Sequence, residues 1–349
     1  MKIDKRKVKK ILCIKLRGIG DVILSTVVLD NLREEFPEAE IDYLTEAPGK
    51  AALDGLPGLN EVLVLERNST LKALSAILKV RNKHYDLVLD FYTNPRTALI
   101  TFLSGARFRA GFPYKGRTYA YNLTGPSERD KFHAADLHLE FLKYLELSTS
   151  SKELHFSLSE KDLEFAENFF NREFKPSDFV VGLSPSGGWA SKKCDPEKFS
   201  EIGDEIASRL SAKVLIIWGP GDKEEALKTM SLMKTKAVLA PPTDIRQMGA
   251  LMKKCRLLIA NDSGPMHMAT ALDVPVLSLH GPTDPLLQGP YGIKHEWIRL
   301  EGLECIGCNL LDCPRHHECF LELPVESVMK KVMTIVEKNN LRLPLDEKN

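Results

Sequence analysis

Three stretches of the chain place small and polar residues directly after an apolar run, where α/β proteins hold ligands. In the first, KLRGIGDVIL, Gly18 and Gly20 allow a tight turn just before Asp21. An Asp in this position can serve as a general base towards a substrate hydroxyl, and Asp is also a common helix N-cap. A dinucleotide-binding loop would need Gly or Ala at position 23, where the chain has Ile23, which disfavours a nicotinamide cofactor.

The second stretch, SPSGGWASKKCDPEKF, begins at Ser184 and has the composition of a phosphate-binding turn. Its small residues leave main-chain N–H groups open to an anion, and Lys192 and Lys193 add positive charge beside them. An exposed lysine pair is the alternative interpretation.

The third stretch, LIANDSGPMHMA, passes from a strand-like run to a helical one through Asp262, Ser263 and Gly264, and His267 falls in the first helical turn. The N-terminus of a helix attracts anions because its N–H groups are free and its dipole is positive there. HGPTDP (280–285) repeats the arrangement at the end of the next strand-like run. Two such turns predict a single ligand that carries a diphosphate.

The elements that position these turns follow from the hydrophobic pattern, in which short apolar runs alternate with helical ones. This alternation predicts β-α-β units and parallel sheets. The polar segment STSSKELHFSL (148–158) interrupts it and predicts a domain boundary. We therefore expect an α/β protein with two Rossmann-like parallel-sheet domains, over 1–158 and 159–323, that face a central cleft. A terminal helix within 324–349 is expected to pack back across both domains.

The overall charge and hydropathy limit the partners. Lys plus Arg and Asp plus Glu each number 48, so a net charge of zero offers no general attraction for nucleic acid. The start, MKIDKRKVKK, is rich in basic residues, which fits a solvated terminus or a weak contact with an anionic membrane surface. No apolar run reaches the ~20 residues of a membrane span, and no signal-peptide core follows the basic start. We expect a cytoplasmic protein.

Four of the seven cysteines form the pattern C-x2-C-x4-C-x5-C: Cys305, Cys308, Cys313 and Cys319. In a reducing compartment, four clustered thiols favour a structural zinc site over disulfides. Free thiols and disulfides remain the alternatives.

Together these stretches resemble family 9 glycosyltransferases, the ADP-heptose:lipopolysaccharide heptosyltransferases. GIGDVILSTVVLDNLREEFPEAEIDYLT, KKCDPEKF, NDSGPMHMATALDVPVLSLHGPTDP and the terminal cysteine region occur in the order of that family. The resemblance implies the GT-B fold, with an acceptor-binding N-terminal domain and a nucleotide-sugar-binding C-terminal domain. It also implies an ADP-sugar donor, a lipid-linked or lipopolysaccharide core acceptor, and peripheral contact with the inner membrane face.

The resemblance further implies roles for individual residues. Asp21 is the expected general base, and Lys193, three residues before Pro196, is expected to neutralise the donor phosphates. The family usually has Trp where this chain has Asp195, so this part of the match is looser. The candidate donor contacts are Ser184, Lys193, Glu224, Asp262, Ser263, Gly264, His267, Gly281 and Thr283, with Glu225 as an equal candidate to Glu224 for the ribose. The candidate acceptor contacts are Gly20, Arg96, Arg107 and Arg109.

The expected reaction is an inverting transfer of a heptose from ADP-heptose to a hydroxyl of the lipopolysaccharide inner core. The sequence contains no D-x-D pair, which metal-dependent sugar transferases commonly use, so no cofactor is expected in catalysis. Two alternatives remain open: a nucleotide-sugar epimerase or hydrolase of the same fold, and a sugar-nucleotide-binding protein without catalysis.

Overall fold

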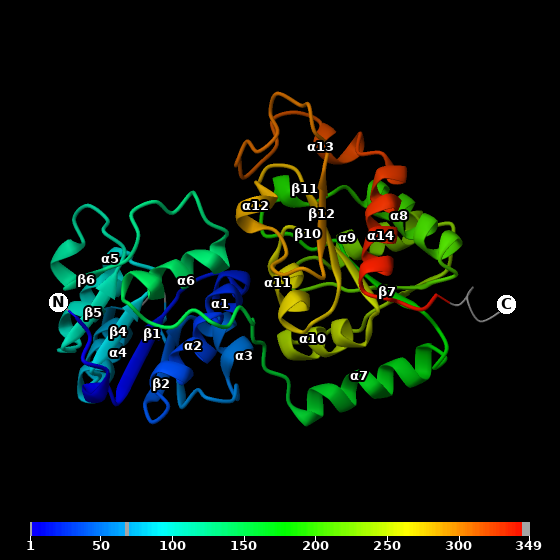
Figure 1. Ribbon diagram of the computed structural model, residues 1–349. Helices are drawn as coiled ribbons and strands as arrows, with labels where there is room; N and C mark the ends of the chain where they lie inside the picture. Colours follow the sequence, from blue (N-terminus) through cyan, green and yellow to red (C-terminus); the bar gives the residue numbers. More distant parts are fainter. Residues whose placement is uncertain (1, 67–69, 344–349) are drawn as a thin grey trace. The chain divides into compact units, whose positions relative to one another are not determined.

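The computed structural model describes the backbone of residues 2–66 and 70–343 and divides into two units, Met1–Ser157 and Leu158–Asn349. The sequence placed the boundary after residue 158, next to this division. Figure 1 colours the first unit from blue to green and the second from green to red. None of the described helices is long and apolar enough to cross a membrane.

The described residues of the first unit form a six-stranded sheet in the order β3-β2-β1-β4-β5-β6, and every pairing is parallel. The strands are β1 (Lys10–Ile14), β2 (Glu40–Thr45), β3 (Glu61–Val64), β4 (Leu87–Asp90), β5 (Phe108–Gly111) and β6 (Leu123–Thr124). The helices around them are η1 (Lys5–Lys7), α1 (Ile19–Ser25), α2 (Val28–Glu35), α3 (Ala47–Leu53), α4 (Thr70–Asn82), α5 (Pro95–Leu103), η2 (Thr118–Ala120) and α6 (Ala134–Tyr144). The central strands β1 and β4 are apolar runs because both of their faces are covered.

A break between α1 and α2 departs from the hydrophobic pattern, which predicts one continuous helix from Asp21 to Phe36. The hydroxyl of Ser25 donates to the carbonyl of Val22 at 2.6 Å, and the hydroxyl of Thr26 donates to that of Ile23, also at 2.6 Å. Such bonds to the preceding turn compete with the helical ladder and bend it. The helix therefore ends at Ser25 and a new one starts at Val28.

The described residues of the second unit form another six-stranded parallel sheet, in the order β12-β11-β10-β7-β8-β9. Its strands are β7 (Val180–Ser184), β8 (Lys213–Ile216), β9 (Ala237–Leu239), β10 (Leu257–Asn261), β11 (Val276–His280) and β12 (Glu296–Arg299). Its helices are α7 (Glu160–Glu173), η3 (Ala190–Lys192), α8 (Pro196–Arg209), α9 (Lys223–Leu232), α10 (Ile245–Lys254), α11 (Gly264–Ala271), α12 (Pro285–Gln288), α13 (Glu318–Leu321) and α14 (Val325–Lys338). The short strands β6 and β12 lie at sheet edges and have no long apolar run that would predict them.

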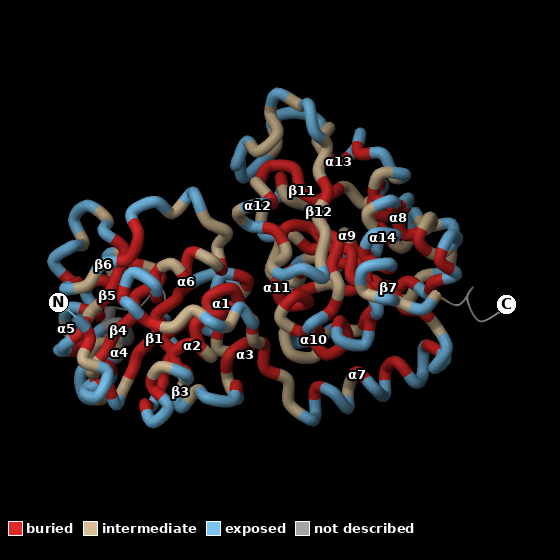
Figure 2. Tube along the Cα trace, in the orientation of Figure 1, coloured by how far each residue is buried: buried red, intermediate tan, exposed pale blue. Residues whose placement is uncertain are grey.

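The terminal helix α14 packs on its own unit, against α8, β11 and β12. Its apolar face, which includes Val328, Val332 and Ile335, joins the core of that unit. Figure 2 shows buried residues in red along the strands inside each unit and exposed residues in pale blue on the outer loops. The predicted contact of this helix with the first domain stays a prediction.

The strand order reverses once in each sheet, between β1 and β4 in the first and between β10 and β7 in the second. At such a switch point, the connections after the two neighbouring strands run to opposite sides and leave a crevice outside their carboxyl ends. All three stretches singled out from the sequence follow strands at these two points, namely β1, β7 and β10.

Candidate active site

Asp21 lies at the switch point of the first sheet, beyond the carboxyl end of β1. It is the third residue of α1, whose N-cap is Gly18, so the interpretation of Asp21 as the N-cap is wrong. Its side chain is 57% exposed, and Oδ1 lies 3.6 Å from Nζ of the buried Lys15. Gly18 has a φ of +30°, and a Cβ there would lie 2.7 Å from Asp21 Oδ2, so glycine leaves room for this carboxylate. The turn presents an accessible carboxylate, as a general base requires.

The residues predicted to contact an acceptor make local contacts. Gly20 is the buried second residue of α1. The guanidinium groups of Arg96 and Arg109 each donate to a main-chain carbonyl at 2.6 Å. That of Arg107 lies over the ring of Phe108, 5.3 Å from its centroid. These contacts stabilise the surrounding turns, and an acceptor role for the three arginines stays a prediction.

In the second unit, Asn261 joins the loops that follow β7 and β10. Its Oδ1 accepts a hydrogen bond from the N–H of Cys194 (3.1 Å), and its Nδ2 donates to the carbonyl of Pro185 (3.0 Å). The hydroxyls of Ser184 and Ser186 are buried beside these loops, and neither has a hydrogen-bond partner among the described residues. Because buried hydroxyls are nearly always bonded, these two are suited to a ligand oxygen.

Asp262 belongs to a buried network at the end of β10. Its Oδ2 lies 2.7 Å from Lys192 Nζ and accepts a hydrogen bond from the hydroxyl of Thr283 at 2.6 Å. Burial works to raise the pKa of Asp262, but His280, Lys192 and Thr283 together lower it. Burial also lowers the pKa of His280 to about 4, so this imidazole is neutral at pH 7. The hydroxyl proton of Thr283, a predicted phosphate ligand, is thus committed to Asp262.

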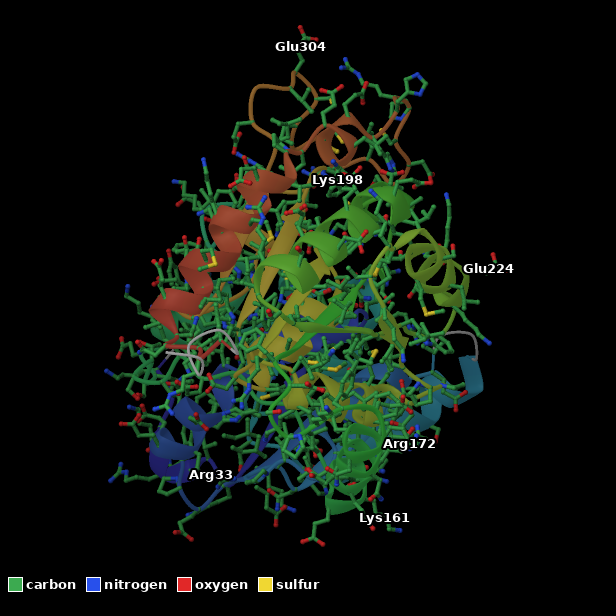
Figure 3. The ribbon with its side chains drawn as sticks, turned by 90° about the vertical axis from the view of Figure 1, so that its right-hand side faces the viewer. Arg33, Lys161, Arg172, Lys198, Glu224 and Glu304 are labelled. Carbon is green, nitrogen blue, oxygen red and sulfur yellow. The ribbon has the colours of Figure 1, made fainter. Side chains whose placement is uncertain are left out.

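Lys193 lines a pocket of about 360 Å³ that also includes Trp189 and Glu225. Its Nζ lies 2.9 Å from Asp222 Oδ1 and 2.7 Å from Glu225 Oε1. Partial burial opposes the charge of Lys193, but these two carboxylates raise its pKa. Glu224 is exposed and lies at the outer surface in Figure 3. Of the two acids that the sequence left open, Glu225 is the one at the pocket.

The remaining donor candidates lie on the turns after β10 and β11. Ser263 is the N-cap of α11 and Gly264 is its first residue, so the free N–H groups of that helix begin here. His267 is buried within the same helix. Gly281 packs against α13, since a Cβ there would lie 2.6 Å from Cys319 Sγ. Close packing therefore explains the glycine at position 281.

The four clustered cysteines follow β12 and extend into α13, and all of them are free thiols. Burial, followed by the charges of Cys313, Cys305 and Cys308, raises the pKa of Cys319 to about 12. In the described part of the chain, no three His, Cys, Asp or Glu side chains are grouped to hold a metal ion. The four thiols are near one another, and the described side chains do not give them the geometry of metal ligands.

A model of glycosyltransferase family 9 (heptosyltransferase) matches residues 74–316, which include all the donor candidates. The chain belongs to glycosyltransferase family 9. This family 9 enzyme is 26% identical over 289 residues to the lipopolysaccharide core heptosyltransferase OpsX of Haemophilus influenzae, which covers 81% of this chain and 82% of that protein.

Two solved structures are similar to this family 9 enzyme over nearly their whole length. A family 9 glycosyl transferase from Veillonella parvula is 25% identical with a TM-score of 0.84, covering 95% of this chain and 97% of its own. The ADP-heptose lps heptosyltransferase II of E. coli is 20% identical with a TM-score of 0.78, covering 95% and 99%. With the two parallel sheets described above, these similarities confirm the predicted GT-B fold class of two Rossmann-like domains.

The sequence predicts no role for Lys15 in this family 9 enzyme, and Lys192 enters only as one of two basic residues beside the predicted phosphate-binding turn. Their side chains are only 6% and 11% exposed, and each lies beside a carboxylate at a switch point. The sequence did contain an indication of the position of Lys15: it directly follows the apolar run of β1, and so lies at the carboxyl end of that strand. The sequence shows Lys192 and Lys193 only as two neighbouring lysines, and nothing in it indicates that their side chains have different environments.

Proposed function

We propose that the protein transfers a heptose from ADP-heptose to a hydroxyl group of the lipopolysaccharide inner core, with inversion at the anomeric carbon. Membership of family 9 supports heptosyl transfer, and the relatives, which are lipopolysaccharide core and ADP-heptose heptosyltransferases, suggest the acceptor and the donor. The observation that carries the mechanism is the accessible carboxylate of Asp21 at the switch point of the first sheet.

In the proposed step, the acceptor oxygen attacks the anomeric carbon while the bond to the ADP oxygen breaks. The hydroxyl proton passes to the carboxylate of Asp21, and the electron pair of the broken bond leaves with ADP. General-base catalysis of this kind contributes about 10²–10⁴ in rate. The ammonium of the buried Lys15 lies 3.6 Å from the carboxylate of Asp21 and helps to hold that side chain at the switch point.

The leaving diphosphate gains negative charge during the reaction, and the turns of the second unit can stabilise it. Lys193 supplies a cation at the pocket, and its partners Asp222 and Glu225 hold its side chain there in the absence of donor. The orphaned hydroxyls of Ser184 and Ser186 and the N-terminus of α11 supply hydrogen-bond donors. Such donors act electrostatically on the charge that develops in the transition state.

Glu225 is the acid proposed to hold the nucleoside ribose, since it lines the pocket and Glu224 does not. A carboxylate accepts hydrogen bonds from vicinal hydroxyl groups, which is how acids bind ribose in nucleotide sites. When donor phosphate pairs with Lys193, Glu225 is released from that ion pair and becomes available to the ribose. Trp189 offers an aromatic wall in the same pocket.

We also propose that catalysis needs no metal ion, because the sequence has no D-x-D pair and cationic groups already lie at the donor turns. Structural zinc on the four clustered cysteines remains a separate prediction. Its ligand geometry is not present among the described side chains.

Peripheral contact with the inner membrane face is a further part of the proposal, because the acceptor is lipid-linked. The basic N-terminal stretch is a weak candidate for that contact. Lys2, Lys5, Arg6, Lys7 and Lys10 all pair with acidic side chains. Exposed apolar side chains on α4, α5 and η2 are a better candidate: Leu74, Leu78, Leu99, Phe102 and Tyr119.

The proposed function is tested by incubating the protein with an inner-core acceptor and with ADP-, UDP- or GDP-heptose. Mass spectrometry should detect a heptosylated acceptor with the ADP sugar, and NMR of the product should show the anomeric configuration opposite to that of the donor. Free heptose formed equally fast without acceptor would instead identify a hydrolase. Transfer from UDP- or GDP-heptose alone would refute the choice of donor.

A further inference from the structure

A buried polar pair lies in β11, just before the turn that carries Thr283. Ser278 and His280 are two residues apart, so they lie on one face of the strand, and both are fully buried. Leu277 and Leu279 alternate with them and join the apolar core. A parallel strand covered on both faces is ordinarily apolar, and a buried polar group costs free energy unless it is hydrogen-bonded. The proposed transfer leaves this pair without a role.

Hydrogen bonds connect the pair to the turns that follow β10 and β7. Ser278 Oγ lies 2.8 Å from His280 Nε2, and His280 Nδ1 lies 3.4 Å from Thr283 Oγ1. The hydroxyl of Thr283 donates to Oδ2 of Asp262 at 2.6 Å, and the ammonium of Lys192 lies 2.7 Å from the same oxygen. These contacts form one chain that links the three adjacent strands β11, β10 and β7 at their carboxyl ends.

The direction of each hydrogen bond in the chain follows from counting protons. The carboxylate of Asp262 is ionised beside Lys192 and can only accept, so the single hydroxyl proton of Thr283 is used in the bond to it. The oxygen of Thr283 then accepts from His280, so Nδ1 of His280 carries a proton. Burial lowers the pKa of His280 to about 4, so the ring has one proton at pH 7, and Nε2 accepts from the hydroxyl of Ser278. His280 is therefore in the Nδ1–H form, which is ordinarily the less populated of the two neutral forms.

The chain of hydrogen bonds ends on a cation at the donor turns. The ammonium of Lys192 lies over the ring of Trp189, 4.5 Å from its centroid, and Trp189 lines the same pocket as Lys193. Asp262 thus holds Lys192 from one side, and the indole ring contacts it as well. Since Asp262 is itself held by Thr283, a change at His280 or Thr283 reaches the donor turns through Asp262.

We propose that His280 and Thr283 are positioning residues: they fix the carboxylate of Asp262 and, through it, the ammonium of Lys192 at the turns where the diphosphate of the ADP-sugar binds. This inference rests on the proposed function, since it concerns the donor of that transfer. A charge that is held in place before the reaction stabilises the leaving group without reorganisation. Thr283 then acts through Asp262, whereas the sequence pattern predicts direct contact with a phosphate.

The first test needs neither ligand nor activity. In long-range ¹H–¹⁵N spectra of ¹⁵N-histidine-labelled protein at pH 7, protonated and unprotonated ring nitrogens give well-separated signals, and those that disappear in His280→Asn identify His280. We expect its Nδ1 to be protonated and its Nε2 to be unprotonated. His295 is the control in the same spectrum, because its Nδ1 accepts the N–H of Val276 at 3.2 Å and its proton should therefore lie on Nε2. A proton on Nε2 of His280 would overturn the proposal.

The second test asks whether Thr283 acts through Lys192. Thr283→Val removes the hydroxyl and keeps the shape of the side chain, and it should weaken the binding of ADP-heptose, measured by calorimetry, by about tenfold. In a Lys192→Met background the same substitution should change the affinity by less than about twofold, because the group on which the chain acts is gone. Equal losses in the two backgrounds would show that Thr283 contacts the donor directly, which would contradict the proposal.

The third test concerns the imidazole of His280. His280→Leu removes the hydrogen bond to Thr283 and should weaken the binding of ADP-heptose by about threefold. His280→Asn keeps an N–H group near the position of Nδ1 and should recover part of this loss. His295→Leu is the matched control and should bind ADP-heptose like the wild type, and urea unfolding checks that each variant is folded. Wild-type affinity in folded His280→Leu would refute the positioning role. Absence of ADP-heptose binding by the wild type would refute the proposed function, and the protonation of the His280 ring would still decide whether the chain of hydrogen bonds exists.

Discussion

Replacement of Asp21 by Asn tests the proposed base with little change of shape. The amide keeps the size of the side chain in the space that Gly18 leaves but cannot accept the hydroxyl proton. We expect kcat to fall by about 10²–10⁴, which is about 3–5 kcal/mol in the activation free energy. The loss of stability should be only about 1 kcal/mol, because the Lys15–Asp21 pair has one partner more than half exposed and is screened by water.

The assay measures turnover by ADP release, donor affinity by calorimetry and stability by urea unfolding. Asp54→Asn is the control, since Asp54 also pairs with a lysine of the first unit, Lys50, at 3.1 Å, but on the surface. It should retain full turnover. The reasoning about Asp21 would be refuted if Asp21→Asn lost donor affinity in proportion to its turnover, or if it kept wild-type turnover.

Three further predictions concern the second unit. Lys193→Ala and His267→Ala should each weaken the binding of ADP-heptose. The loss of affinity in Lys193→Ala should shrink more as salt is added, because Lys193 acts as a charge. Calorimetry at two salt concentrations measures both effects, and unchanged affinity in either variant would contradict the donor site. His280 and His295 have pKa values lowered to about 4 by burial, so the unfolded chain binds protons first as the pH falls. The free energy of unfolding should therefore decrease between pH 6.5 and 4, by up to about 3 kcal/mol for each imidazole, in urea titrations across this range. A flat profile would show that the two imidazoles take up protons as readily in the folded chain as in the unfolded one. Turnover should be equal in EDTA and in added Mg²⁺. The metal content is a separate measurement: elemental analysis of protein purified without added metal should find stoichiometric zinc if the four clustered cysteines bind it. Activity abolished by EDTA and restored by Mg²⁺ would contradict a metal-free reaction, and less than about a tenth of an equivalent of zinc would exclude the structural site.

Much of the fold could be predicted because its signals are local. A central strand such as β10 is buried on both faces and is apolar from Leu257 to Ala260, and the amphipathic helices repeat with their own period. The pattern failed where local hydrogen bonds compete with it, as at Ser25 and Thr26, whose hydroxyls end α1 before the apolar pattern does. It also failed for the edge strands β6 and β12, which need little apolar sequence.

The sequence by itself determined the fold class, the family and the turns in which ligand-binding residues lie, because these depend on short motifs and on the order of strands and helices. Only the tertiary structure decided which side chain in each turn has which partner. Lys192 and Lys193 are neighbours in the chain, yet one pairs with Asp262 and the other with Glu225. Arg129 comes to lie beside Lys15 because α6 packs on α1, more than a hundred residues away in the sequence. Charge and burial at these positions are set by segments distant in sequence, and no local pattern contains them.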